Sequence, residues 1–506
     1  MRRRPNILLV TSDQHRGDSY GFENPVIYTP HLDRLAGDGT RFSACITPNL
    51  VCQPSRASIL TGLLPLTHGV CDNGIDLPPA TAAAGFAGQL AAGGYRTGFI
   101  GKAHFSTLHT FAPTGTPECK TSSASYGPDW FGPYMGFQHA ELVTEGHNNW
   151  LPMKPPHGQH YERWYHADGR GEEKNSLYRE RRLPLSEAVQ TWHSGLPVAW
   201  HNSTWIGDRT IDWLKGNAAE PFCLWASFPD PHHPFDAPEP WGRLHHPDSI
   251  RLPEHRTLDL ERRPWWHQAV HNKPPGPGAE KILGNYLQYA PQTDRQLREI
   301  FANYYGMISL IDHNVGRILA VLGDLGIADE TYVVFTSDHG EWLGDHGLLF
   351  KGPMAYEGLL RVGMIVRGPG VPGANVVDDP VSTLDLAPTF LDWAGLASGA
   401  PLHGESLQPL IANRASRDFA RSEWDLGPAR IGIPLRLRTV RAGAHKLTIE
   451  LDSGAGELYD LGIDPHEMEN RFEDPAYAPV RRRMQDMIAS RANDALGAPL
   501  PRVGMA

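Results

Sequence analysis

The chain has 506 residues, 40% of them hydrophobic and 20% charged, which is typical of a soluble globular protein and excludes a disordered one. Its 46 Lys and Arg against 57 Asp and Glu give a formal net charge of −11, which disfavours nucleic acid and anionic membranes as partners and favours a small-molecule substrate. Single cores stop growing at roughly 250 to 300 residues, so we expect at least two structural units.

The N-terminal segment MRRRPNILLVTSD combines basic residues with a short apolar run, as a secretion signal does. Its apolar part, Ile7 to Val10, is shorter than the ~7 residues such a signal needs, and no small-residue cleavage site follows. We therefore expect a buried strand and a cytoplasmic protein. No apolar run approaches the ~18 residues of a membrane span, so no membrane association is expected.

Short apolar runs alternate with helix-like segments over the first four hundred residues. The apolar runs predict strands at 6–11, 95–101, 222–228, 331–338 and 363–370. Helices are predicted near 31–38, 54–62, 204–215, 294–325 and 383–396. This alternation predicts an α/β fold, a mostly parallel sheet with helices on both faces.

The pattern changes near residue 417. The stretch PLRLRTVRAGAHKLTIEL predicts antiparallel strands paired around a Gly turn, and a last helix is expected near 476–494. We therefore expect a catalytic α/β domain over 1–416 and a smaller C-terminal α+β subdomain over 417–506. Two stretches rich in Pro, Gly, His and Trp, about 106–200 and 229–290, are expected to be ordered loops that wall a pocket.

Polar residues follow the predicted strands, where ligands bind in doubly wound sheets. NILLVTSDQ and TYVVFTSDHGE both end in a TSD triplet, which supplies Asp13 with Gln14 and Asp338 with His339. Two carboxylates, an amide oxygen and an imidazole suit calcium, magnesium or manganese better than structural zinc. Each Asp alone would more often cap a helix, but the matched pair favours a metal site.

Two further strand ends carry bases and cations. GFIGKAHF supplies Lys102 and His104, and FCLWASFPDPHHPF supplies His232 and His233. Taken singly, such side chains are most often solvated or hydrogen-bonded in a core. Their common position after strands favours a shared site.

The five cysteines are too few and too irregularly spaced for a disulfide framework, and none forms a CxxC pair. In VCQPSRASILTG, Pro54 suits a first helical turn, which places Cys52 just outside the helix N-terminus, where an anion is stabilised. A buried inert thiol is the alternative. A thiolate phosphatase is excluded, because its Arg would stand six residues after the Cys, where this chain has Ser58.

The run from Cys52 to Arg56, C-Q-P-S-R, resembles the maturation motif of the formylglycine-dependent sulfatases of the alkaline phosphatase superfamily. The motifs NILLVTSDQ, FIGKAHF, DPHHPF, SDHGEWLGDHGLLFKG, LLRVGMIVRGPG and ELYDLGIDPHEMEN follow the family in order. The resemblance spans nearly the whole chain except the loops at 106–200 and 236–290. It implies an alkaline phosphatase-like fold and a separate maturation enzyme that oxidises Cys52 to formylglycine (3-oxoalanine).

The resemblance also implies hydrolysis of a small-molecule or saccharide sulfate monoester to an alcohol and sulfate. One hydroxyl of the hydrated aldehyde attacks sulfur to form a covalent sulfate ester, and the other hydroxyl then expels sulfate. One divalent ion, calcium in preference to manganese or magnesium, is bound by Asp13, Gln14, the residue derived from Cys52, Asp338 and His339. Arg56 orients the diol, Lys102 and Lys351 bind the sulfate oxygens, His104 takes the second hydroxyl proton, His232 is the general acid, and Asn73 is a further sulfate contact.

The pair Asp13-Gln14 departs from the Asp-Asp that many family members carry. It removes one negative charge, which weakens calcium binding or shifts preference toward manganese. Choline sulfatases and phosphonate monoester hydrolases are similar in this Asp-Gln and Asp-His pairing, and this similarity implies a homodimer or tetramer. A phosphonate monoester or phosphodiester hydrolase is therefore the alternative function, while Lys102 and His104 favour a sulfatase. A non-catalytic binding protein would have lost site residues, and none is missing.

Overall fold

The computed structural model describes residues 4–144, 151–272 and 291–505. Two parts of the predicted loops, 145–150 and 273–290, lie outside the described residues. The main sheet has eight strands in the order β11-β2-β10-β9-β1-β8-β4-β5. They are β1 (Asn6–Ser12), β2 (Thr40–Phe42), β4 (Arg96–Gly101), β5 (His139–Leu142), β8 (Phe222–Ser227), β9 (Thr331–Ser337), β10 (Met364–Arg367) and β11 (Asn375–Val377).

The centre of this sheet is parallel. Strand β1 runs parallel to β8 and β9, and β4 runs parallel to β8 and β5. Only β10 runs against its neighbours β9 and β2 within the described sheet. The predicted mostly parallel α/β fold is therefore confirmed.

Every residue of β1 is buried, as expected for a strand covered on both faces. Ile7 and Leu9 pack with α2 (Cys52–Thr61), α5 (Phe86–Ala92) and α13 (Leu386–Trp393). Leu8 and Val10 point the other way, because successive side chains alternate along a strand. They pack with α1 (Pro30–Gly37), α8 (Asn202–Asn217) and α11 (Asp294–Asp324).

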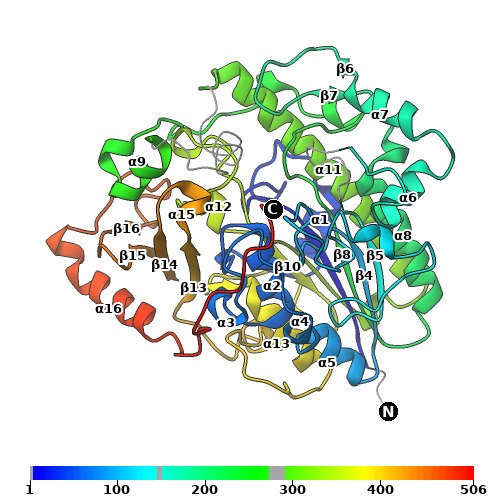
Figure 1. The fold of residues 1–506 in the computed structure, drawn as a ribbon. Helices are drawn as coiled ribbons and strands as arrows, with labels where there is room; N and C mark the ends of the chain where they lie inside the picture. Colours follow the sequence, from blue (N-terminus) through cyan, green and yellow to red (C-terminus); the bar gives the residue numbers. More distant parts are fainter. Residues whose placement is uncertain (1–3, 145–150, 273–290, 506) are drawn as a thin grey trace.

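A second sheet is antiparallel, in the order β13-β14-β15-β16. Its strands are β13 (Ala420–Leu426), β14 (Leu435–Ala442), β15 (His445–Glu450) and β16 (Gly456–Asp460). The predicted Gly turn lies between β14 and β15, where Gly443 has φ 55°. Figure 1 shows this sheet beside the main one, with α16 (Ala478–Ala489) on its outer side. The division of the domains at residues 416 and 417 stays a prediction.

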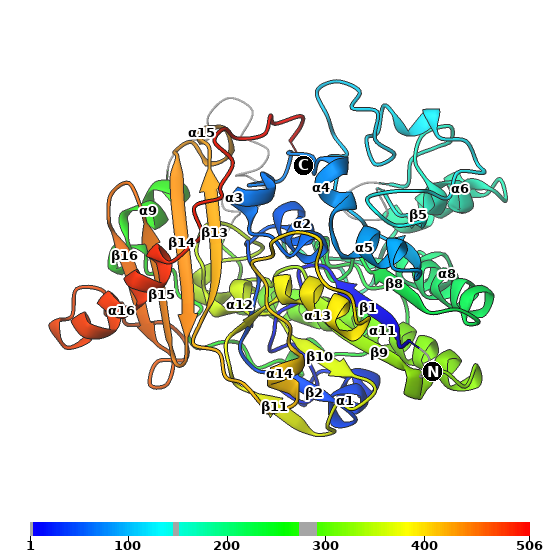
Figure 2. The ribbon, with the colours of Figure 1, turned by 90° about the horizontal axis from the view of Figure 1, so that it is seen from below.

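The end of the chain returns to the main domain. Figures 1 and 2 show the C-terminal tail running along β13 and past α3 (Pro65–His68) toward α2 and α4 (Pro79–Ala83). There the Val503 amide donates to the Gly74 carbonyl at 2.8 Å, and Arg502 Nη1 donates to the Asn73 carbonyl at 3.0 Å. Residues from opposite ends of the sequence therefore meet near the start of α2.

The predicted loops contain short regular elements that the sequence analysis did not identify, among them the edge strand β5. The remaining strands and α-helices of the described residues are β3 (Cys45–Ile46), β6 (Arg181–Arg182), β7 (His193–Ser194), β12 (Val381–Ser382), α6 (His160–His166), α7 (Gly171–Arg179), α9 (Trp265–Asn272), α12 (Glu357–Leu360), α14 (Gln408–Ile411) and α15 (Pro428–Ile431). All five cysteines are free. Among the described residues, no helix combines the length and apolarity that crossing a bilayer requires.

Candidate active site

Four adjacent parallel strands, β9, β1, β8 and β4, bring their carboxyl ends to one edge of the sheet. Ser12 pairs with Ser337 in register, so the next residues, Asp13 and Asp338, leave their strands side by side. The same edge receives the other polar residues that were predicted from strand ends, namely Gln14, Lys102, His104, His232 and His339.

The predicted metal ligands converge. One ligand atom from each of Asp13, Cys52, Asp338 and His339 lies within 4.8 Å of the others, and all four residues are buried. Gln14, the fifth predicted ligand, has a buried Oε1 without a hydrogen-bond partner among the described residues. A set of ligands rich in oxygen, with one imidazole and a buried amide oxygen that has no hydrogen-bond partner, fits a divalent ion.

Cys52 lies closer to its helix than predicted. It is the first residue of α2, with Val51 as N-cap, and not the residue before the helix. Its Sγ is 3.0 Å from Lys351 Nζ and 3.2 Å from His339 Nε2. Burial and Asp13 would raise the pKa of the thiol, but Lys351, Lys102 and His339 together hold it well below its ordinary value.

Arg56 lies one helical turn further along α2 and is completely buried. Its Nε donates to Asp338 Oδ2 at 2.8 Å, and its Nη2 lies 3.2 Å from Asp13 Oδ2. Its Nη1 donates to the Lys102 carbonyl and to Ser227 Oγ, both at 2.8 Å. The guanidinium therefore bridges the carboxylates of two predicted metal ligands, Asp13 and Asp338.

Two lysines, Lys102 and Lys351, contribute positive charge near Cys52. Lys102 Nζ is 2.5 Å from Asp13 Oδ2, and its side chain keeps 15% of its surface exposed, so a ligand can reach it. Lys351 Nζ is 3.0 Å from His232 Nε2. Burial and Lys351 lower the pKa of His232 well below its ordinary value, so this ring is neutral in the free protein.

His104 adopts a left-handed backbone conformation, with φ 51°. Burial lowers the pKa of its ring, an effect that its hydrogen bond to Cys52 partly offsets. The backbone amides of His104, Phe105 and Ser106 all donate to the buried carboxylate of Glu118, at 2.5, 3.1 and 3.0 Å. Tyr134 donates its hydroxyl to the same carboxylate at 2.5 Å. Glu118 thus fixes the turn that carries His104.

Sequence reasoning missed two residues of this region, Glu118 and Glu341, and gave His233 no role of its own. Glu118 stands in a predicted loop with no motif around it. Glu341 follows the SDHG motif directly, and this adjacency was a usable signal; it accepts a hydrogen bond from Gln14 Nε2. The general-acid role was assigned to His232 alone, and His233 Nδ1 lies 3.2 Å from Gln14 Nε2.

Asn73 lies at the start of α2, where its Oδ1 accepts a hydrogen bond from the Gln53 amide at 3.0 Å. It therefore supports the helix that begins with Cys52. Its predicted contact with sulfate stays a prediction.

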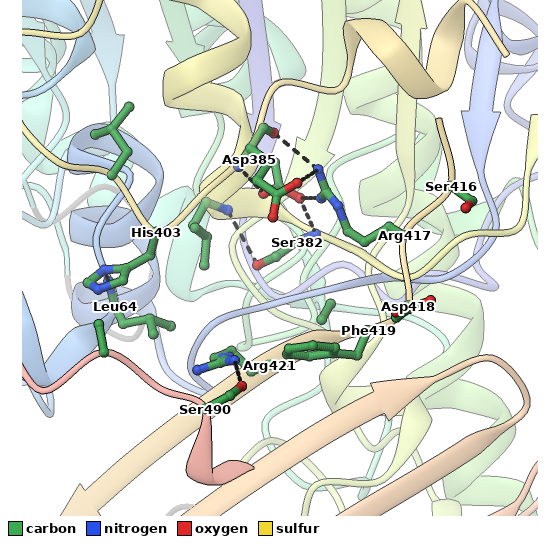
Figure 3. A pocket seen from close by; sticks show the side chains of 15 residues that line it. Leu64, Ser382, Asp385, His403, Ser416, Arg417, Asp418, Phe419, Arg421 and Ser490 are labelled. Carbon is green, nitrogen blue, oxygen red and sulfur yellow. Dashed lines mark hydrogen bonds and ion pairs between the residues drawn. The ribbon is translucent and has the colours of Figure 1, made fainter. Parts of the chain in front are cut away.

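A separate cavity of about 540 Å³ lies where β13 meets the main domain. Figure 3 shows Arg417 directed at Asp385, and Arg421 directed at Ser490. None of the predicted site residues lines it. This cavity is therefore distinct from the candidate active site.

Comparison with known proteins identifies the family of this chain. The family model "Sulfatase" matches residues 5–396, and "N-sulphoglucosamine sulphohydrolase, C-terminal" matches residues 344–494. The uncharacterized sulfatase YidJ of Escherichia coli is 28% identical over 490 residues, which cover 96% of this chain and 86% of YidJ. The choline-sulfatase of Rhizobium meliloti is 27% identical over 484 residues, which cover 93% of this chain and 83% of that protein.

Among solved structures, the phosphonate monoester hydrolase of Agrobacterium radiobacter is similar over 96% of this chain and 95% of its own, with 27% identity and a TM-score of 0.78. Relatives of both kinds, sulfatases and phosphonate monoester hydrolases, thus share this fold. The family model covers most of the chain, and the chain therefore belongs to the sulfatase family of the alkaline phosphatase superfamily.

Proposed function

We propose that this protein hydrolyses a small-molecule or saccharide sulfate monoester to an alcohol and inorganic sulfate, after a separate enzyme has converted Cys52 to formylglycine. The observation that carries the proposal is the position of Cys52 Sγ, buried and within hydrogen-bonding distance of Lys351, His339 and Asp13. This sulfur marks the place of the hydroxyl oxygens of the hydrated aldehyde. A nucleophile at this position lies next to Lys351, whose positive charge can bind the anionic sulfate group.

The residues at this edge of the sheet fit one divalent ion, calcium in preference to manganese or magnesium. Asp13, Gln14, Asp338, His339 and residue 52 would hold it. The bound ion would lower the pKa of a hydroxyl at residue 52 and stabilise charge that develops on the ester. Arg56 holds these two aspartates in place through its hydrogen bonds to Asp338 and Asp13.

The other side chains supply binding and proton transfer. Lys102 and Lys351 bind the sulfate oxygens, where charge develops as residue 52 attacks sulfur. Bringing an anionic ester next to His232 raises the pKa of that ring, because opposite charge favours the imidazolium. His232 then donates a proton to the leaving alcohol, and His104 takes the proton of the second hydroxyl, which expels sulfate and restores the aldehyde.

The second candidate is a phosphonate monoester or phosphodiester hydrolase with the same nucleophile. The neutral ligand Gln14 and the similarity to the phosphonate monoester hydrolase favour it. Lys102 and His104, both beside Cys52, favour the sulfatase.

The test compares turnover of 4-nitrophenyl sulfate with that of a 4-nitrophenyl phosphonate monoester, using protein co-produced with a formylglycine-generating enzyme. We expect the higher kcat/KM with the sulfate, and loss of both activities in Cys52→Ala. A higher kcat/KM with the phosphonate would replace the first function by the second. Retained activity in Cys52→Ala would contradict both.

A further inference from the structure

Glu341 is completely buried, two residues beyond the metal-site residue His339. Both of its carboxylate oxygens are used. Oε2 accepts a hydrogen bond from Gln14 Nε2, and Oε1 accepts from the backbone amides of Leu343, at 3.0 Å, and Phe350. One carboxylate therefore contacts both a candidate metal ligand and the backbone next to Lys351.

The contact with Gln14 fixes which end of its amide points where. Gln14 Nε2 is the donor to Glu341 Oε2, so the NH2 group of Gln14 faces the carboxyl group of Glu341. The same nitrogen lies 3.2 Å from His233 Nδ1, which gives the NH2 group a second contact. Gln14 Oε1 is left buried and without a hydrogen bond among the described residues. This is the atom that a cation would take.

We propose that Glu341 is a positioning residue that holds the amide of Gln14 with its oxygen toward the metal. This inference rests on the metal site of the proposed function. The ligand at position 14 is a neutral amide, and the carboxyl group of Glu341 lies one hydrogen bond behind it. The amide nitrogen would repel a cation, so the wrong orientation of Gln14 would remove a ligand.

The backbone of Glu341 is itself rigidly held. Arg16 Nη1 donates to the carbonyl oxygens of Glu341 and Trp342, at 3.0 and 2.7 Å. The same nitrogen lies 2.8 Å from Asp345 Oδ2. A carboxylate fixed in this way can impose an orientation on a neighbouring side chain.

A purely structural role for Glu341, as the acceptor for Leu343 and Phe350, makes a different prediction. In Glu341→Gln, the amide oxygen still accepts from those two backbone amides. Only the atom that faces Gln14 changes, from an acceptor to a donor. A structural role therefore predicts unchanged metal affinity, whereas the positioning role predicts a loss.

The experiment measures Mn²⁺ and Ca²⁺ affinity by titration calorimetry on protein freed of metal with a chelator. We expect Glu341→Gln to bind each ion about 10- to 100-fold more weakly, as when a residue that orients a metal ligand is lost. The double variant Gln14→Glu with Glu341→Gln restores a donor facing an acceptor, and we expect its affinity to return at least to that of the parent. Asp312→Asn is the matched control and should not change metal affinity. Like Glu341, Asp312 is a buried carboxylate that accepts hydrogen bonds from two backbone amides, those of His31 and Leu32.

The outcomes separate this inference from the proposed function. Parent affinity in Glu341→Gln, together with a large loss in Asp13→Asn, would overturn the positioning role alone. Absence of metal binding by the parent protein would overturn both. If Glu341→Gln does not fold, the double variant decides: recovery of folding and metal binding supports the pairing, and a folded double variant with weak binding contradicts it.

Discussion

Replacing Arg56 by Met removes the guanidinium that bridges Asp13 and Asp338 inside the protein. All three side chains are buried, with 0 to 1% of their surfaces exposed. Removing one partner of a buried ion pair destabilises a protein by about 3 to 5 kcal/mol, because the other charge remains buried without its counterion. In metal-free protein we therefore expect the free energy of unfolding to fall by about this amount.

A bound divalent ion should reduce that loss. The ion supplies another cation to the same two carboxylates. The loss of stability that remains in Arg56→Met then comes from the missing hydrogen bonds of Arg56 to the Lys102 carbonyl and Ser227 Oγ. Two such bonds contribute about 2 kcal/mol together. The loss of stability caused by Arg56→Met should therefore be about 2 kcal/mol smaller with metal than without it. This difference corresponds to metal binding about 30-fold tighter in Arg56→Met than in the parent.

Urea unfolding of parent and variant, with a chelator and with saturating Mn²⁺, measures these quantities. The matched control is Arg491→Met, because Arg491 forms an ion pair with Glu423, at 2.6 Å, and contacts none of the metal-site residues. Its loss of stability should not depend on metal. A loss in Arg56→Met that is equally large with and without metal would refute the reasoning, because Arg56 and the metal would then not share the carboxylates.

Three further predictions concern residues around the nucleophile. In protein made without the maturation enzyme and stripped of metal, the rate at which iodoacetamide labels Cys52 should rise less steeply with pH than it does in Lys351→Met, because Lys351 helps to hold the pKa of the thiol well below its ordinary value. Glu118→Ala should lower kcat at least about 100-fold through loss of the turn that holds His104, with metal affinity unchanged. His232→Asn should lower kcat by about 100- to 10,000-fold for alkyl sulfates, and less for 4-nitrophenyl sulfate, whose leaving group needs little protonation.

Each of these three predictions is checked against a second residue, variant or substrate in the same experiment. Burial raises the pKa of Cys71 to about 12, so its labelling should rise about tenfold per pH unit in the same sample. A Cys52 rate that rises in parallel would contradict the lowered pKa. Tyr134→Phe removes one of four donors to Glu118 and should lower kcat far less than Glu118→Ala. Equal losses for both sulfates in His232→Asn would remove its assignment as general acid.

The fold and the centre of the site were predictable from local patterns. Apolar runs of the right length gave the strands, and the polar residues that follow them, Asp13 and Asp338 above all, lie together because parallel neighbours end at one edge. Cys52 was predicted by its motif, and its helix begins at Cys52 itself, two residues before the predicted start at residue 54, since Val51 is the N-cap.

The supporting residues were not predictable in the same way. Glu118 and Glu341 are two of 57 acidic residues, and most of those are solvated. Their roles depend on backbone amides and on the amide of Gln14, which are brought to them only by the folded loops. Strand β5 was missed because its four residues, His139–Leu142, are too short to show a period.

Mass spectrometry of the peptide containing residue 52, combined with the specific activity of the same preparation, tests the central claim most directly. Preparations made with increasing amounts of the maturation enzyme should show an increasing fraction of aldehyde at residue 52, with sulfate ester turnover in proportion to it. Full turnover in a preparation whose residue 52 is entirely the unmodified thiol would contradict the account.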